Sequence, residues 1–192
     1  MIRPIVVVGH PVLRQKAKRI SQIDRAIQRL IDDMIETMKA APGVGLAAPQ
    51  VGVPLRLAVI DVDDTITVIV NPEIVKSFGE ITLDEGCLSV PGFWGQLTRA
   101  ERVSVKSLDR NGKELRIREA EGLFAQALQH EINHLDGQLY IDRMDSLDKL
   151  QRSEPLRKRE ADALRARRQA GLLDDEDEDE DEDGEEEEEA SA

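Results

Sequence analysis

The sequence contains one cysteine and no long apolar run, and each shortage excludes a class of protein. A lone Cys87 cannot form an internal disulfide, which excludes a disulfide-stabilised scaffold. The apolar stretch within residues 1–8 is too short for a signal peptide, and no later stretch approaches the roughly eighteen apolar residues of a membrane span. We therefore expect a cytoplasmic protein with a reduced thiol and no contact with a membrane.

The acidic residues are concentrated at one end of the chain. The formal net charge is −13, but residues 174–189 contain fifteen Asp or Glu and no Lys or Arg. Without them, 24 acidic residues face 26 basic ones, so the rest of the chain carries about +2. A segment with nothing to bury stays disordered. We predict a folded domain over 1–148, a basic helical extension over 149–173 and a disordered acidic tail over 174–192.

The extension and the tail have charges that leave several roles open. Residues 146–170 carry eight Lys or Arg against four acids, so the basic part 149–168 is a candidate for contact with ribosomal RNA, which salt would weaken. The alternative is a solvated helix with scattered charge pairs. The tail is either a solubilising extension or a segment that folds back on the basic one. No contact with DNA is expected.

Hydrophobic periodicity predicts two helices with strands between them. Over residues 24–41, apolar side chains recur at helical spacing until Pro42, and the second helix spans about 120–136 before Gly137. The Gly- and Pro-rich run 43–52 predicts no regular element. Strands in the middle of the chain give an α+β arrangement. Four segments have the pattern of short strands: Arg56–Val62, Ile66–Asn71, Arg102–Leu108 and Glu114–Arg118.

Two of the three histidines, His130 and His134, stand four residues apart in the second helix. That spacing puts both imidazoles on one face, one turn apart, where they can bind a single metal ion. Glu131 is placed to accept a proton from a water that the metal activates. At this point the third ligand is open between a downstream carboxylate, as in many metalloproteases, and the thiol of Cys87. His10 precedes a proline and is interpreted as a surface or turn residue.

Three segments together, in this order and spacing, resemble the bacterial peptide deformylases. They are Gly-Val-Gly-Leu-Ala-Ala-Pro-Gln at 43–50, Glu-Gly-Cys-Leu-Ser at 85–89 and Gln-His-Glu-Ile-Asn-His-Leu-Asp-Gly at 129–137. The resemblance covers about residues 1–148 and gives no account of the acidic tail. It implies an α+β fold in which short antiparallel β-sheets pack around a central metal-binding helix, with N-terminal and C-terminal helices.

The resemblance implies that Cys87, His130 and His134 bind one divalent metal ion, with water completing a tetrahedral site. A thiolate ligand suits Fe(II), with Zn, Ni or Co as alternatives. The implied reaction removes the formyl group from the N-terminal formyl-methionine of newly synthesised polypeptides and releases formate. Glu131 would accept the proton of the attacking water and pass it to the departing amine.

The resemblance also assigns oxyanion and substrate contacts. The Gln50 side-chain amide and the backbone N–H of Leu88 would stabilise the oxyanion, each worth about 3 kcal/mol. From local sequence alone, Gln50 is as well explained by satisfying loop backbone groups. Val44 and Gly45 would pair with an extended substrate backbone. Because positions 123, 127 and 130 share one helical face, the candidates for the methionine pocket are Val44, Leu123 and Ala127, with core packing as the alternative for each.

Two further expectations concern the surroundings of this site. Glu85 and Arg99 occupy positions that in the family form an ion pair beneath the metal loop. Phe93 and Trp94 place an aromatic pair where other members carry polar or basic residues, at the mouth of the cleft. Trp94 would shape the preference for substrate residues after methionine, or serve only in packing.

The rival functions are a zinc endopeptidase, which would be indifferent to replacement of Cys87, and a ribosome- or RNA-associated module with a structural metal.

Overall fold

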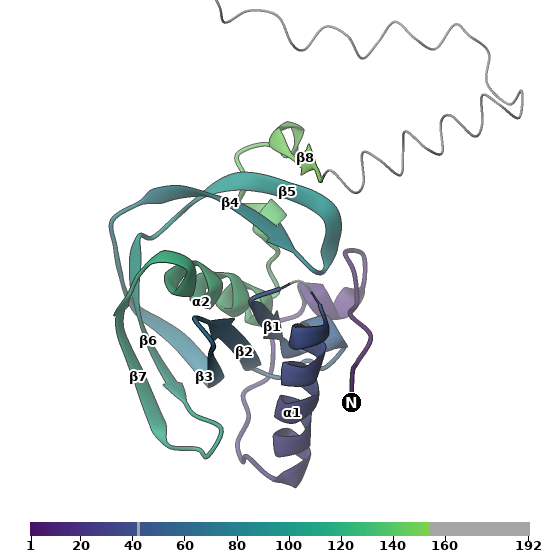
Figure 1. Cartoon of the computed structure of the whole chain (residues 1–192), viewed down its shortest axis with the longest axis vertical. Helices are drawn as coiled ribbons and strands as arrows, with labels where there is room; N and C mark the ends of the chain where they lie inside the picture. The colour runs from purple at the N-terminus through teal and green to yellow at the C-terminus, as the bar shows by residue number, and fades with distance from the viewer. Residues whose placement is uncertain (42, 154–192) are drawn as a thin grey trace, which may run out of the picture. The chain divides into compact units, whose positions relative to one another are not determined.

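The computed structural model describes residues 1–41 and 43–153, which fold into helices and two antiparallel sheets (Figure 1). The α+β class predicted from the sequence is confirmed. By their contacts, residues Met1–Gln151 group into one unit and the chain from Arg152 into a second. None of the helices in the described part is both long and apolar enough to cross a membrane.

The first predicted helix is α1 (Arg25–Ala40). It begins at Asp24, whose carboxylate accepts hydrogen bonds from the backbone N–H groups of Ala26 and Ile27 at 2.8 and 2.9 Å. Such a cap satisfies N–H groups that have no partner within the helix. The side chains that α1 buries follow the predicted periodicity: Leu30, Ile31, Met34 and Met38.

The larger sheet has five strands in the order β1-β2-β3-β6-β7, each antiparallel to its neighbours. A tight turn at Asp63 and Asp64 joins β2 to β3, and both residues have positive φ, as a two-residue hairpin requires. The four predicted strands all lie here, although β3 continues past Asn71. The strand bounds are β1 (Gly45–Ala47), β2 (Leu57–Val62), β3 (Thr65–Phe78), β6 (Arg102–Leu108) and β7 (Glu114–Ala120).

The strands of the smaller sheet were not among the segments predicted as strands. This sheet consists of β4 (Ile81–Cys87), β5 (Val90–Arg99) and the short β8 (Gln151–Arg152). Glycine and proline interrupt the sequence of the β4–β5 hairpin, and both are depleted in strands, so its local pattern is weak. The hairpin is specified by cross-strand pairs such as Leu83 with Leu97, and its register shifts next to Cys87.

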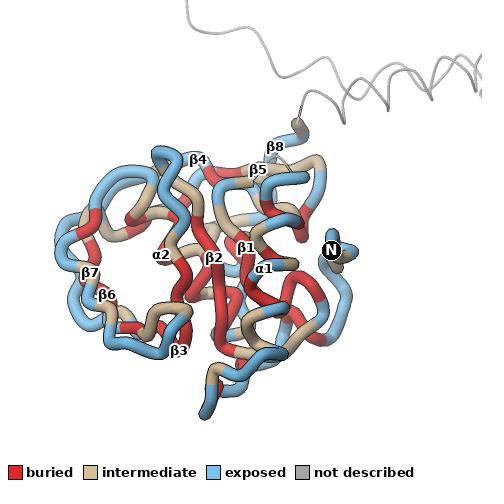
Figure 2. The backbone as a smooth tube through the Cα atoms, turned by 60° about the horizontal axis from the view of Figure 1, so that its bottom comes forward, coloured by how far each residue is buried: buried red, intermediate tan, exposed pale blue. Residues whose placement is uncertain are grey.

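The second predicted helix is α2 (Gly122–Leu135), which lies between the β4–β5 hairpin and strands β1 and β2 (Figure 1). Strand β2 is buried along most of its length (Figure 2). Its side chains alternate: Ala58 and Ile60 join the core that includes α2, whereas Leu57 and Val59 join the core beneath α1. A third core under β5 contains Leu13, Val90, Leu97, Leu139 and Tyr140.

One expectation about an irregular segment is corrected. The run 43–52 was expected to lack regular structure, but it forms β1 and the 3-10 helix η2 (Ala48–Val51), because pairing with β2 supplies partners that the local sequence does not reveal. Three more 3-10 turns are η1 (Pro11–Arg14), η3 (Tyr140–Arg143) and η4 (Leu147–Lys149).

The ends of the domain differ from the prediction in one respect. His10 is the expected turn residue: its Nδ1 accepts the N–H of Val12 at 3.2 Å and caps η1. The predicted C-terminal helical extension 149–173 instead begins with the last residue of η4 and strand β8. The rest of that extension and the acidic tail 174–192 lie outside the described residues.

Candidate metal centre

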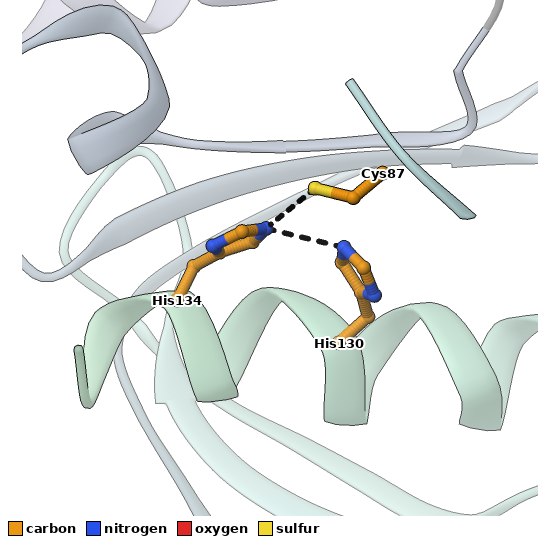
Figure 3. A group of neighbouring side chains, drawn as sticks. All are labelled: Cys87, His130 and His134. Carbon is orange, nitrogen blue, oxygen red and sulfur yellow. Dashed lines mark hydrogen bonds between the residues drawn. The ribbon is translucent and has the colours of Figure 1, made fainter. Parts of the chain in front are cut away.

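His130 and His134 project from the same face of α2, as their spacing predicts, and Cys87 meets them from the end of β4 (Figure 3). The two Nε2 atoms are 3.1 Å apart, and Cys87 Sγ lies 3.2 Å from His134 Nε2. A tetrahedral ion with bonds of roughly 2.0–2.3 Å would hold such atoms about 3.4–3.6 Å apart. The three ligand atoms all lie within 4.8 Å of one another, so two imidazoles and one thiol can together hold a metal ion with one position left open.

The thiol of Cys87 receives polar contacts from two other segments. The Ser89 backbone N–H points to Sγ at 3.4 Å, and the Gln50 side-chain Nε2 lies 3.5 Å from it. Both donors point at the sulfur atom and hold it in place beside the two histidines. The thiolate is the form that binds a metal.

His130 is oriented by a buried ion pair. Its Nδ1 is hydrogen-bonded to Glu85, which leaves Nε2 directed at the centre. Arg99 contacts the same carboxylate, with Nε 3.0 Å from Glu85 Oε2, and also reaches Asn133 on α2. The structure therefore contains the expected pair between Glu85 and Arg99. Burial opposes ionisation of Glu85, but hydrogen bonds from His130 and Arg99 outweigh it and lower its pKa to about 2.

The centre attracts positive charge. Burial alone would lower the pKa of His130, yet hydrogen bonds to Cys87 and Glu85 raise it well above its usual value. Burial does lower the pKa of His134, which keeps that ring neutral and able to bind a metal. The negative groups that stabilise a proton on His130 would also stabilise a divalent cation at this centre.

Glu131 is buried beside this centre, and burial raises its pKa to about 7. Among the described residues, its Oε2 has no hydrogen-bond partner. Its Oε1 occupies space that a side chain at position 45 would need, since a Cβ on Gly45 would lie 2.3 Å from that oxygen. Gly45 is therefore required for the placement of Glu131, a reason that the sequence did not reveal.

Gln50 is held by its own amide oxygen. Oε1 accepts the backbone N–H of Ala47 at 2.8 Å, so the interpretation that Gln50 satisfies loop backbone is correct for that atom. The other end of the amide, Nε2, lies 3.3 Å from Ser89 Oγ and faces the sulfur of Cys87. One side chain thus has both the structural and the site-facing role that the sequence left as alternatives.

A cleft of about 670 Å³ opens onto the centre. Val44 and Leu123 are 40% and 49% exposed and form part of its rim, whereas Ala127 is 4% exposed and forms part of its wall. His134 is buried behind the lining, and Trp94 is half-buried on β5 outside it. The other sequence-predicted residues in the lining are Gly45, Gln50, Cys87, Leu88, His130 and Glu131.

Several residues that shape the site were missed from the sequence. Asp84 and Gln126 line the cleft, and position 126 adjoins the predicted helical face. The Gln129 side chain bonds both backbone groups of Ala100, at 3.0 and 2.9 Å, and so fixes α2 against the end of β5. Tyr140 stacks beneath His130 with ring centroids 6.5 Å apart. A tyrosine in an apolar segment carries no local signal that it will contact a distant histidine.

Comparison with known proteins gives a consistent result. The family model described as polypeptide deformylase matches residues 2–150. A curated peptide deformylase from Dehalococcoides mccartyi is 57% identical over 156 residues, which are 80% of this chain and 93% of that protein. A crystal structure of a peptide deformylase from Legionella pneumophila superposes with a TM-score of 0.75 at 47% identity and covers 87% of this chain and 99% of that one.

A structural relative also carries a ligand. The peptide deformylase from Synechococcus elongatus, solved in complex with actinonin, has a TM-score of 0.73 and 41% identity, over 78% of this chain and 87% of its own.

Proposed function

The chain belongs to the peptide deformylase family, and we propose that Cys87, His130 and His134 hold the metal on which its activity depends. It is a metal-dependent hydrolase that removes the formyl group from the N-terminus of nascent polypeptides. This family membership decides against a zinc endopeptidase and against a module whose metal is only structural. The proposals concern which residues perform each step.

The donor set supports Fe(II) as the resident metal, with Zn, Ni or Co as alternatives. One thiolate and two imidazoles suit these ions, whereas Mg²⁺ and Ca²⁺ prefer oxygen ligands. When bound, such an ion lowers the pKa of a water and polarises the formyl carbonyl. The Glu85–Arg99 ion pair behind His130 and the polar contacts to Cys87 position these ligands before the metal binds.

Glu131 is proposed as the general base and then the general acid. Its raised pKa, about 7, is suited to exchanging a proton near neutral pH, and its Oε2 is not committed to another described residue. It accepts a proton as water attacks the formyl carbon. It then gives that proton to the amine nitrogen as the carbon–nitrogen bond breaks, which releases formate.

Gln50 and Leu88 are proposed as donors to the oxyanion that forms during attack. The Gln50 amide is fixed through Oε1, so its Nε2 needs little reorganisation to donate. The backbone N–H of Leu88 follows Cys87 in the loop that lines the cleft. Each such donor is worth about 3 kcal/mol in the transition state.

The substrate peptide is proposed to extend along β1. Among the described strands β1 pairs with β2 alone and so is at the edge of its sheet, and Val44 and Gly45 line the cleft. An edge strand can pair with an extended peptide. The methionine side chain would enter between Val44, Leu123 and Ala127, which lie around the apolar part of the cleft.

Two proposals concern the setting of the reaction. Because nascent chains carry the formyl group, we place the enzyme in the cytoplasm. The basic stretch 149–168 is proposed to contact ribosomal RNA, on the basis of its charge; binding to ribosomes should then weaken steeply as salt rises. Removal of residues 174–192 tests the tail: unchanged ribosome affinity at low salt would exclude a role for it in that contact.

The convergence of Glu131, Gln50 and the three ligands on one cleft carries these assignments, and formate release tests them. Formyl-Met-Ala-Ser is incubated anaerobically with Fe(II)-loaded enzyme, and Glu131→Ala is compared with wild type after metal content has been matched. The wild type should release formate and the variant should lose most of its rate. A variant that retains full rate with metal bound would remove Glu131 from the mechanism.

A further inference from the structure

His134 is held in place differently from His130. The Nδ1 of His130 is hydrogen-bonded to Glu85, which fixes the direction of its ring. The Nδ1 of His134 is buried and has no hydrogen-bond partner among the described residues. A histidine that binds a metal usually donates its second ring nitrogen to a fixed acceptor. Without such an acceptor, the position of His134 Nε2 depends on the packing of its ring and on the helix end that carries it.

That helix end is fixed by contacts from outside α2. His134 stands next to Leu135, the last residue of α2. The last carbonyl groups of a helix have no partner within the helix itself. The carbonyl of Leu135 accepts the backbone N–H of Ala17 at 2.8 Å and the Nη1 of Arg56 at 3.3 Å. Two segments that are distant in the chain therefore meet at the residue that follows His134.

Arg56 connects this helix end to strand β3. Its Nε and Nη2 donate to the carbonyl of Pro72 at 3.1 and 2.9 Å, and its Nη1 also donates to Asp136 Oδ1 at 2.7 Å. The residue is buried, and its backbone is fixed by hydrogen bonds to Lys18 and Asn71, both of 2.8 Å. A guanidinium presents its donors in a rigid fork. Arg56 therefore sets the separation between β3 and the end of α2.

The N-terminal segment 14–20 packs against the same helix end. A Cβ on Gly137 would lie 3.0 Å from backbone carbons of Arg14 and Gln15, so this segment lies directly against the turn that follows α2. Arg56 also places a cation at the C-terminus of the helix, where the helix dipole favours positive charge. The end of α2 is thus enclosed on several sides, and Arg56 is the charged group within that enclosure.

We propose that Arg56 is a positioning residue for the metal ligand His134, because it holds the C-terminal end of α2 against β3. This inference rests on the proposed metal centre and names a residue that acts on it from outside the cleft, since Arg56 is not among the described lining residues. A metal site tolerates little change in ligand separation. Loss of a residue that orients a metal ligand costs about 10- to 100-fold in metal affinity, so zinc should leave Arg56→Met about tenfold faster than the wild type.

The test follows zinc release from the full-length, zinc-loaded enzyme into an excess of a colorimetric chelator. Arg56→Met removes the side-chain hydrogen bonds to β3 and α2, whereas Arg56→Lys keeps the charge but can reach only one of these two anchors. Asp24→Ala is the control, because it removes the cap of α1 and leaves the contacts at the end of α2 unchanged. Urea unfolding measures the stability of each variant, and the visible absorption of the cobalt-loaded enzyme reports the geometry of its ligands.

Zinc release should be fastest in Arg56→Met, intermediate in Arg56→Lys and unchanged in Asp24→Ala. The cobalt absorption should change in the two Arg56 variants and remain that of the wild type in Asp24→Ala. In the cobalt-loaded enzymes, both Arg56 variants should lower kcat for formyl-Met-Ala-Ser and leave KM near the wild-type value, because Arg56 does not touch the substrate. If Arg56→Met does not fold, Arg56→Lys decides the question.

Two results would overturn the inference. One is zinc release from Arg56→Lys at the wild-type rate with an unchanged cobalt spectrum. The other is release that accelerates equally in Asp24→Ala for an equal loss of unfolding free energy, since stability alone would then explain it. His134→Ala separates these results from failure of the proposed metal centre: zinc held by that variant as firmly as by the wild type would contradict the ligand assignment itself.

Discussion

Replacement of Gly45 by alanine should displace Glu131 while leaving the fold and the metal in place. Gly45 does not have positive φ, so alanine is compatible with the backbone there. The new Cβ would lie 2.3 Å from Glu131 Oε1 and 2.9 Å from Cδ, so the carboxylate must retreat by roughly 1 Å to reach ordinary van der Waals contact. The nearest atoms to that Cβ all belong to Glu131, and none to a metal ligand.

The expected loss follows from the size of this displacement. A misplacement of about 1 Å at a catalytic group can cost about 100-fold in rate, which corresponds to about 2.7 kcal/mol of transition-state stabilisation. We therefore expect kcat/KM for formyl-Met-Ala-Ser to fall about 100-fold in Gly45→Ala. Metal content should remain at the wild-type level, which elemental analysis of the purified protein would measure.

A double-mutant cycle with Glu131→Ala identifies the cause. Overpacking should destabilise Gly45→Ala by about 1–3 kcal/mol, and removal of the Glu131 carboxylate should restore most of that loss in the double variant, as measured by urea unfolding. A Gly45→Ala enzyme with full activity would refute the reasoning. So would an equal destabilisation in the presence and absence of the Glu131 side chain, since the clash would then involve some other group.

Three further outcomes follow from the polar contacts. Arg99→Met should destabilise the fold by about 3–5 kcal/mol in urea unfolding, because it leaves Glu85 buried without its cation, whereas Arg102→Met, from an exposed pair, should cost under about 1 kcal/mol. Gln50→Ala should lower kcat by about 100- to 1,000-fold with metal retained; a rise in KM with kcat unchanged would contradict its role as an oxyanion donor. Folding lowers the pKa of Glu85 from 4.5 to about 2, so ionised Glu85 stabilises the folded state above pH 4.5 and this stabilisation is lost as pH falls toward 2. In chelator-treated protein, the free energy of unfolding of Glu85→Gln should therefore depend less on pH over that window than that of the wild type.

The parts of the fold that could be predicted are those specified by nearby residues. The apolar stripe of α1 repeats every three to four positions. Asp24 caps the helix by accepting the backbone N–H of Ala26, only two residues further along the chain. The placement of His130 and His134 on one face follows from helical geometry alone. These features need no information from the rest of the chain. The structure contains the helix and the histidine face as predicted, and the cap at Asp24 is a local signal that was not used.

The parts that could not be predicted depend on distant residues. The β4–β5 hairpin has a weak local pattern, and its register is set by cross-strand pairs such as Leu83 and Leu97, which are fourteen residues apart in the chain. The resemblance placed Trp94 at the cleft mouth, but Trp94 is not among the described residues that line the cleft. Because the segment is a strand, Pro91 and Gly92 reach the lining and Trp94 stands opposite Gly86, where it packs half-buried.

The sequence identified Gly45 as a site residue but gave only part of the reason why a glycine is needed there. A glycine next to a substrate suggests close approach of the substrate backbone, and Gly45 does line the cleft. The structure adds that the missing side chain is replaced by a carboxylate from α2, which is more than eighty residues later in the chain. Only packing in three dimensions reveals that contact.

The three ligands and their neighbours come from elements that belong to three separate cores. The face of α2 next to the histidines is packed in the first core, Leu88 and the start of η2 in the second, and Cys87 and Tyr140 in the third. A metal site tolerates little change in ligand separation. A cavity in any one core would shift one element relative to the other two, so activity and metal affinity should decline before the fold is lost. The chemistry is therefore sensitive to packing throughout residues 1–151, including at positions that never touch the substrate.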